Sequence, residues 1–329
     1  MDTVVSGIRS TGNLHLGNYF GALKNFIEMQ HHNHCFFFIA DFHMLTTHPK
    51  PENLHGNVKA VLSEYLAAGL DPAAATIYRQ SDIHEIPELY MLLNMNAYIG
   101  ELERTASFKD KVRKNSENVN AGLLTYPVLM AADIMIHRAS KVPVGKDQEQ
   151  HLEMTRKYAR RFNTMYNVEY FPEPVPYNFG KELVKLPGLD GSGKMGKSEG
   201  NGIFLCDEPE AIRKKVMKAV TDAGPTVPNS PVSEPVQNIF TLMNVVSEPD
   251  TLKFYKEKYA DCSIRYGDLK KQLAEDIIKV VAPIGERIKE ISANDAYLKK
   301  VIDEGAEKAR ISARQTLTDV REFMGFKSF

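Results

Sequence analysis

The alternation of short apolar runs with helical apolar repeats near the N-terminus constrains the fold more than any other feature. Apolar segments at 3–6, 36–40 and 75–78 have the length and composition of buried strands. Between them, apolar residues recur at helical spacing from Leu16 to Ile27 and from Leu54 to Leu66. This strand-helix-strand-helix-strand order predicts an α/β fold built on a parallel sheet.

Parallel sheets of this kind bind ligands in the crevice outside the carboxyl ends of their strands. In this sequence those ends are residues 6–12 and 41–46. We therefore expect the functional site to draw side chains from both segments.

The rest of the chain indicates two domains. Residues 87–137 read as mainly helical, and a strand-like segment at 141–144 leads into a helix that ends near Phe162. Residues 170–202 are rich in Pro, Gly and Asn and predict loop, whereas the remainder predicts helices with a Pro-rich break at 224–235.

We accordingly expect a Rossmann-like catalytic domain at 1–200, with a helical insertion at about 85–140 and a nucleotide loop at 190–200. A C-terminal all-helical domain would occupy 201–329. The sequence leaves open whether its last helices pack back on the catalytic domain.

Charge and cysteine usage exclude several classes of protein. Lys and Arg total 41 against 42 for Asp and Glu, so there is no net cationic field to hold polyanions indiscriminately. The three cysteines are dispersed, which fits neither a disulfide framework nor a zinc ribbon. The contiguous run His31–Cys35 lacks the second ligand pair that zinc sites use, so no metal site is predicted. With no leader-like N-terminus and no apolar stretch near 18 residues, we expect a cytoplasmic protein without a membrane partner.

A first candidate for phosphate binding follows the first predicted strand. The segment Thr11–Asn18 leads into a helix whose N-terminal N–H groups and dipole favour an anion. Gly17 would let a nucleotide approach the backbone, and His15 and Asn18 are hydrogen-bond donors for phosphate oxygens. A helix cap with a surface histidine is the alternative interpretation.

A second candidate, Gly191–Ser198, formally matches the phosphate-binding P-loop pattern. A P-loop needs a strand before it and a helix after it. Here Pro187-Gly188 precedes and Glu199-Gly200 follows, which suits neither element. A mobile loop whose Lys194 and Lys197 close over a triphosphate is the preferred interpretation, and a solvated Gly-Lys loop is the alternative.

Together, in this order and separation, the two segments resemble the HIGH and KMSKS signatures of class I aminoacyl-tRNA synthetases. His15–Asn18 matches the first signature with Asn as its last residue, and Lys194–Ser198 matches the second with Gly196 for its first Ser. Further segments resemble tryptophanyl-tRNA synthetases of the bacterial type and cover nearly the whole chain: Ser6–Ile8, Tyr98–Arg104, Gly122–Pro127, Met130–Ile134, Val142–Gly145, Asp147–Gln148, Ala219–Asp222 and Asp303–Ala309.

This resemblance implies the reaction and its partners. The enzyme would activate L-tryptophan with ATP and Mg²⁺ to tryptophanyl-adenylate and then transfer tryptophanyl to tRNA(Trp). It would be a homodimer joined through the middle helical region, and its C-terminal helices would read the anticodon. Tyrosyl-tRNA synthetase is the nearest alternative. A P-loop ATPase and a small nucleotidyltransferase are more distant ones.

The resemblance also assigns roles to residues. His15, Asn18, Lys194 and Lys197 would be catalytic. ATP would be bound by Arg9, Gly17, Asn18, Gly145, Asp147, Lys194, Met195, Lys197 and Ser198. Tryptophan would be bound by Ser6, Gly7, His43, Tyr126, Met130, Asp133 and Gln148. Better-known members of the family carry Gln where this chain has Arg9, so its contacts would differ.

Two of these regions also have interpretations from the residues alone. Asp133 stands in an apolar run, where an unpaired carboxylate would cost several kcal/mol, so it needs a partner. The resemblance implies that this partner is the indole N–H of tryptophan. Lys109 and Lys111 belong to a basic patch that is either a tRNA or triphosphate contact or a solvated helix face.

Overall fold

A computed structural model describes the chain from residue 1 to 329 except for residues 115, 146–147, 178–184, 197–198 and 328–329. Five parallel strands form one sheet in the order β3-β2-β1-β4-β5. Their bounds are β1 (Thr3–Arg9), β2 (His34–Ala40), β3 (Thr76–Arg79), β4 (Lys141–Val142) and β5 (Val175–Pro176). The predicted α/β fold with a parallel sheet is confirmed.

The fifth strand was not predicted, because its segment reads as loop. Val175 N–H donates to the Ser140 carbonyl and Tyr177 N–H to that of Val142, at 2.9 and 3.0 Å. Pro176 has no N–H to donate, which a strand tolerates at the edge of a sheet. The Pro-, Gly- and Asn-rich composition of this region therefore predicts loop, although β5 forms there through two hydrogen bonds to its neighbouring strand.

Alternate residues of the strands face two separate cores. Val4, Phe37 and Ile77 contribute to a core with the helices that follow β1 and β2. Their neighbours Val5, Phe38 and Tyr78 contribute to a second core with the helices of the middle region. This alternation is the period of two that a strand imposes, and it explains why these strands are apolar on both faces.

The segments between the strands form helices where the apolar repeats predict them. The helix after β1 is continuous through α1 (Leu16–Asn18), η1 (Tyr19–Leu23) and α2 (Lys24–Met29). The next helix, α3 (Pro51–Ala68), ends at Gly69, whose φ of 118° is costly for other residues. Between β2 and α3 lies η2 (Phe42–Thr47). After β3 come η3 (Gln80–Asp82), α4 (Glu85–Asn94), α5 (Ile99–Leu102), α6 (Ala106–Lys114), η4 (Ser116–Asn118), α7 (Ala121–Leu124), α8 (Tyr126–Met135) and α9 (Glu149–Tyr166).

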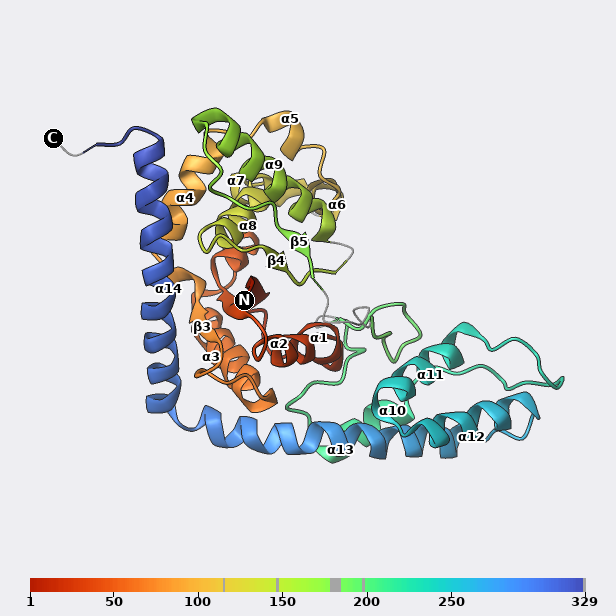
Figure 1. The fold of residues 1–329 in the computed structure, drawn as a ribbon. Helices are drawn as coiled ribbons and strands as arrows, with labels where there is room; N and C mark the ends of the chain where they lie inside the picture. Colours follow the sequence, from red (N-terminus) through yellow and green to blue (C-terminus); the bar gives the residue numbers. More distant parts are fainter. Residues whose placement is uncertain (115, 146–147, 178–184, 197–198, 328–329) are drawn as a thin grey trace.

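The C-terminal part is helical, and its last two helices return to the N-terminal part of the chain (Figure 1). Its helices are α10 (Pro209–Met217), α11 (Glu234–Val246), α12 (Pro249–Ala260), α13 (Tyr266–Ser292) and α14 (Asp295–Phe323). At 1.5 Å per residue α13 is about 40 Å long, and it reaches α3, where Arg287 Nε donates to the Ala67 carbonyl at 2.7 Å. In the described part of the chain, no helix combines the length and apolar character that crossing a bilayer requires.

Helix α14 lies against β3 and α4 and closes one side of the sheet (Figure 1). Arg310 Nε donates to the Asp82 carbonyl at 3.0 Å, and Ser312 Oγ lies 3.2 Å from His137 Nδ1. Burial lowers the pKa of His137 to about 3, so its ring stays neutral between Ser312 and the Tyr78 hydroxyl. The contact is closest at Gly305, where an added Cβ would lie 1.8 Å from the Ile77 carbonyl oxygen.

Gly305→Ala tests how tightly α14 is seated. In an open helix this change stabilises by about 1 kcal/mol, but here the new methyl would collide with the backbone of β3. We expect the free energy of unfolding to fall by about 3 kcal/mol or more, since backbone cannot yield as a side chain can. Denaturant titration measures it.

Gly267→Ala is the matched control, because nothing lies within 4 Å of its added Cβ on α13. It should leave stability unchanged or slightly raised. If both substitutions behaved alike, α14 would not be packed against β3 in solution.

Candidate functional site

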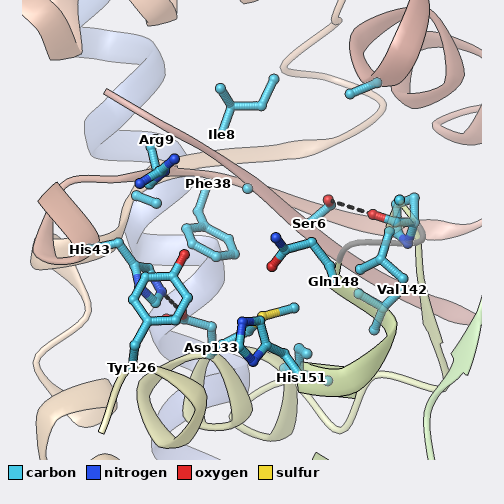
Figure 2. Close-up of a pocket in the computed structure, with 18 of the residues that line it drawn as sticks. Ser6, Ile8, Arg9, Phe38, His43, Tyr126, Asp133, Val142, Gln148 and His151 are labelled. Carbon is cyan, nitrogen blue, oxygen red and sulfur yellow. Dashed lines mark hydrogen bonds and ion pairs between the residues drawn. The ribbon is translucent and has the colours of Figure 1, made fainter. Parts of the chain in front are cut away.

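A cavity of about 410 Å³ opens at the carboxyl end of β1 and is lined from β1, the segment after β2, α8 and the start of α9. Figure 2 shows the Tyr126, Gln148 and Asp133 side chains around it. The following residues singled out in the sequence line it: Ser6, Gly7, Arg9, Asn18, His43, Lys111, Tyr126, Met130, Asp133, Gly145 and Gln148. Segments far apart in sequence therefore meet at one edge of the sheet.

Helix α8 supplies the floor of the cavity through one of its faces. Tyr126, Met130 and Asp133 are spaced i, i+4 and i+7, which places them on one stripe of the helix. Pro127 stands in the first turn, where its missing N–H costs nothing and its fixed φ favours helix. The small residues Ala131 and Ala132 are fully buried and allow close packing against the second core.

Asp133 is the acidic group of the cavity and is 1% exposed. Its Oδ1 accepts from Gln80 Nε2 at 2.7 Å, and its Oδ2 lies 2.8 Å from His43 Nε2. Burial raises the pKa of Asp133, and the hydrogen bonds from His43 and Gln80 oppose that rise. A carboxylate has about four lone-pair sites, so two bonds leave it able to accept another donor from the cavity.

Gln80 is a site residue that the sequence analysis missed. It directly follows β3, is fully buried, and also accepts the Phe42 N–H on its Oε1 at 3.1 Å. It thereby joins the ends of β2 and β3 to α8. The strand-end rule could have found it, because a polar residue at the carboxyl end of a buried strand is the same signal that marked residues 41–46.

His151 was missed as well. It lies one helical turn after Gln148 on α9, is 2% exposed and lines the cavity, with its ring 5.6 Å from that of Tyr126. The Tyr126 ring in turn lies 4.4 Å from that of His43. The signal available in the sequence was the i, i+3 spacing of His151 from Gln148, since two residues at that spacing share a face of the helix.

Two residues of β1 shape the wall of the cavity. Ser6 Oγ donates to the Pro143 carbonyl at 3.3 Å and so ties β1 to the segment after β4. Gly7 makes room for Phe38, because an added Cβ would lie 2.6 Å from atoms of that ring. A larger residue at position 7 would displace the aromatic ring that lines the cavity.

The first signature forms a reciprocal helix cap. His15 Nδ1 accepts the Asn18 N–H at 3.2 Å, while Asn18 Oδ1 accepts the His15 N–H at 3.1 Å. Because Nδ1 accepts, the proton of the neutral His15 ring resides on Nε2. Asn18 likewise keeps its side-chain amide group as a donor. The cap and the donor roles are therefore properties of the same two residues.

The segment that follows the second signature is joined to the first signature through the backbone. Leu16 N–H donates to the Ile203 carbonyl and Leu205 N–H to the Leu14 carbonyl, both at 2.9 Å. Met195 is 1% exposed, and an added Cβ on Gly17 would lie 3.7 Å from its Cβ. Its side chain thus anchors the loop in the core.

Several predicted residues lie outside this cavity lining. Lys194 and Lys109 are exposed and do not line the cavity, and Gly17, His15 and Met195 lie beside it in the first turn and the loop. Asp147, Lys197 and Ser198 fall outside the described residues.

The structure contradicts the P-loop alternative. The nearest described strand before Gly191 is β5, which ends at Pro176, and the next described helix, α10, begins at Pro209. The residues after the loop are instead held by backbone pairing to residues 14–16, and Leu189 before it donates its N–H to the Asn201 carbonyl. Within the described ranges, no three His, Cys, Asp or Glu side chains are grouped as a metal site would require.

Known proteins resemble this chain over its whole length. A family model for class I tRNA synthetases (W and Y) matches residues 2–282. The tryptophan–tRNA ligase of Porphyromonas gingivalis is 64% identical over 327 residues, 99% of this chain and 100% of the relative. That of Fusobacterium nucleatum is 41% identical over 325 residues, 99% and 98% of the two chains. A crystal structure of the Campylobacter jejuni tryptophanyl-tRNA synthetase complexed with ADP and tryptophan has a TM-score of 0.86 at 33% identity, covering 98% of this chain and 99% of that one.

Gln80→Leu tests the support of Asp133. We expect the free energy of unfolding near neutral pH to fall by about 1–3 kcal/mol, because the buried carboxylate loses a donor. Removal of that donor raises the pKa of Asp133 further, so the deficit should shrink as pH falls through that pKa and the carboxyl becomes protonated. Denaturant titrations over a pH series measure both effects.

Gln30→Leu is the control, since Gln30 is 5% exposed and bonds backbone groups of Gly69 and Asp71 at 3.1 and 2.9 Å. Its side chain also contacts His31, at 3.5 Å. The free energy of unfolding of this variant should be lower than that of the parent protein, and this deficit should not shrink as the pH falls. A Gln80 deficit that did not change with pH would show that Gln80 does not support the carboxylate.

Proposed function

The chain belongs to the class I tRNA synthetases and within them to the tryptophanyl-tRNA synthetases, and we propose that its 410 Å³ cavity holds tryptophan and the reacting end of ATP. The enzyme activates L-tryptophan with ATP and transfers the tryptophanyl group to tRNA(Trp). The tyrosyl alternative is not supported, because the similar relatives named above are tryptophan–tRNA ligases.

The buried carboxylate of Asp133, which is hydrogen-bonded to two side chains, carries the assignment of the substrate pocket. The apolar residues Phe38, Met130 and Val142 also line this cavity. The carboxylate is a hydrogen-bond acceptor whose position is fixed by Gln80 and His43. An indole brings an apolar ring and one N–H donor, and a site built for that donor discriminates against rings that lack it. Met130 would pack on the ring as a polarisable wall.

The other end of the amino acid would meet polar groups. Tyr126 and Gln148 project into the cavity from α8 and from the N-cap of α9 (Figure 2). A phenolic oxygen and an amide oxygen are suitable acceptors for the α-ammonium group. Ser6, Gly7 and His43 would complete this part of the pocket. With the indole and the ammonium both fixed, the substrate carboxylate points toward the nucleotide.

The nucleotide would extend from this carboxylate toward the first helix. Asn18, Gly145 and Arg9 line the cavity and are available to it, and Asp147 and Gly17 would border the adenosine and the phosphates. His15 Nε2 and the Asn18 amide supply donors for phosphate oxygens, with orientations fixed by their shared cap. Lys194, Met195, Lys197 and Ser198 would cover the triphosphate, and Lys109 and Lys111 would approach it from α6.

The proposed chemistry needs positioning and charge stabilisation from the protein. A tryptophan carboxylate oxygen attacks the α-phosphorus of ATP, the bond to the bridging oxygen breaks, and pyrophosphate leaves with that electron pair. A ribose hydroxyl of the tRNA terminus then attacks the carbonyl carbon and AMP leaves. Mg²⁺ would arrive with the ATP phosphates, which is how that ion is commonly bound, and not through a protein cluster.

The remaining partners follow from surfaces outside the cavity. Residues 201–329 would read the anticodon with helices α10–α13, where Lys253 and Lys256 border a hollow of about 490 Å³ between α11 and α12. A tRNA-charging enzyme of this kind would act in the cytoplasm.

A second copy of this chain would cover an exposed apolar surface on the middle helices. Met91, Met95, Tyr98 and Ile99 are 49%, 77%, 60% and 65% exposed. Contiguous apolar side chains of this size are a usual mark of a protein interface. They belong to α4, α5 and the turn between them, beside α8 and α9, which carry the substrate pocket.

Pyrophosphate exchange into ATP tests the function, since it reports adenylate formation without tRNA. Exchange should depend on tryptophan among the standard amino acids. Asp133→Asn places an amide hydrogen where the carboxylate accepts, so kcat/KM for tryptophan should fall roughly 10- to 100-fold with KM for ATP little changed.

Asp276→Asn is the matched control, because Asp276 is also buried but lies on α13 away from the cavity. It should leave exchange unchanged. Equal losses for tryptophan and ATP in Asp133→Asn would mean that this carboxylate does not contact the indole.

Met95→Glu tests the dimer. A carboxylate on the apolar surface would be repelled from a dry interface, so the protein should sediment as a monomer at micromolar concentration. Ile311→Glu, on an exposed residue of α14, should leave the dimer intact. A parent protein that sediments as a monomer would rule out this interface.

A further inference from the structure

Asn201 is a buried polar residue that the mechanism has not used. It is 4% exposed and stands between the lysine loop and the residues that pair with the first signature. A buried amide is costly unless its donors and acceptor are satisfied. The groups that satisfy it belong to the loop.

The Asn201 side chain bonds both arms of that loop. Its Nδ2 lies 3.1 Å from Asp190 Oδ1, 2.9 Å from Ser192 Oγ and 3.2 Å from the Lys194 carbonyl oxygen. Its Oδ1 accepts the Gly196 N–H at 2.9 Å. One carboxamide thus fixes the backbone immediately on each side of Met195.

The surrounding residues reinforce this arrangement. Asp190 Oδ1 accepts the Ser192 N–H at 3.0 Å, and Ser192 Oγ donates to the Lys194 carbonyl at 3.2 Å. Gly188 is required, because an added Cβ would lie 2.3 Å from Asn201 Nδ2. Asn201 also accepts the Leu189 N–H on its own carbonyl at 3.0 Å.

The loop around Met195 needs these hydrogen bonds to hold one conformation. Among the described residues from 190 to 200, only Met195 is buried, so hydrophobic packing fixes the loop at a single point. Four glycines, Gly191, Gly193, Gly196 and Gly200, leave the backbone with more freedom to lose than other residues would. With Met195 alone, the chain could rotate about its anchor and carry Lys194 to many positions.

We propose that Asn201 is a positioning residue of adenylate formation, whose carboxamide clasps the loop so that Lys194 is presented beside the first signature. The inference rests on the proposed role of Lys194 at the triphosphate. Asn201 itself touches no substrate. It acts by removing, before ATP binds, conformations of the loop in which the Lys194 ammonium is misplaced, which lowers the ordering cost of binding.

Asn201→Asp is the informative substitution. It keeps an oxygen for the Gly196 N–H but removes both donors and places a second carboxylate 3.1 Å from the position of Asp190 Oδ1. We expect kcat/KM for ATP in pyrophosphate exchange to fall about tenfold or more. KM for tryptophan should change less than about twofold, since the substrate pocket is untouched. A merely structural role would impair both substrates together.

A double variant that combines Asp190→Asn with Asn201→Asp exchanges the two groups and restores one donor–acceptor pair. In the parent protein Asp190 Oδ1 accepts from both Asn201 Nδ2 and the Ser192 N–H. After a rotation of the new side chain, the amide introduced at position 190 would donate to the carboxylate introduced at position 201 and accept the Ser192 N–H on its oxygen. Recovery of several-fold in kcat/KM for ATP over Asn201→Asp alone would support the clasp. An absence of recovery would overturn it, because the pairing would then not be what the single variant lost.

Two further measurements keep the test decisive if Asn201→Asp folds poorly. Asp190→Ala and Ser192→Ala remove partners of the clasp from outside the core, so they should weaken kcat/KM for ATP without changing Tm. Asn244→Ala, at an exposed asparagine of α11, should leave exchange as in the parent protein.

Lys194→Ala separates the two hypotheses. If exchange survives Lys194→Ala, the proposed role of the loop fails and the clasp fails with it. If Lys194→Ala abolishes exchange while the Asn201, Asp190 and Ser192 variants remain at parental activity, the proposed function stands and the clasp is wrong.

Discussion

The parallel pairing of β1 with β2 is the constraint on which the site depends. Its register sets Gly7 beside Phe38 and Arg9 beside Ala40, so both strands end at the same edge of the sheet. The chain then turns into α1 from one strand and into η2 from the other. The groups that we propose to bind phosphate and amino acid are neighbours because strands that pair in parallel must release their following residues on the same side.

The local sequence pattern was sufficient to predict those helices and strands whose buried residues recur at a regular spacing. The strands β1, β2 and β3 and the helix α3 have apolar periods that leave few alternatives, and the first signature follows a strand end where such a sheet binds ligands. β5 could not be found in this way. It is two residues long, contains Pro176 and is exposed, so it has neither the apolar period nor the length that marks a strand.

The parts of the site that sequence did not reveal depend on partners distant in the chain. Nothing in the neighbourhood of Gln80 indicates that it will meet Asp133, 53 residues later. Asn201 likewise looks like an ordinary turn residue after Gly200. Their roles arise only when burial forces each amide to find donors and acceptors, and those partners are decided by the packing of whole elements.

Helix α14 has a consequence for how the protein is made. It is the wall against β3 and it seats Gly305 on the backbone of Ile77, yet it is translated after every described strand of the sheet. Until then one edge of the sheet lacks its cover, although every strand has already been synthesised. The sheet therefore completes its packing only after α14 has been translated, and a product terminated before α14 would expose the sheet edge that this helix covers.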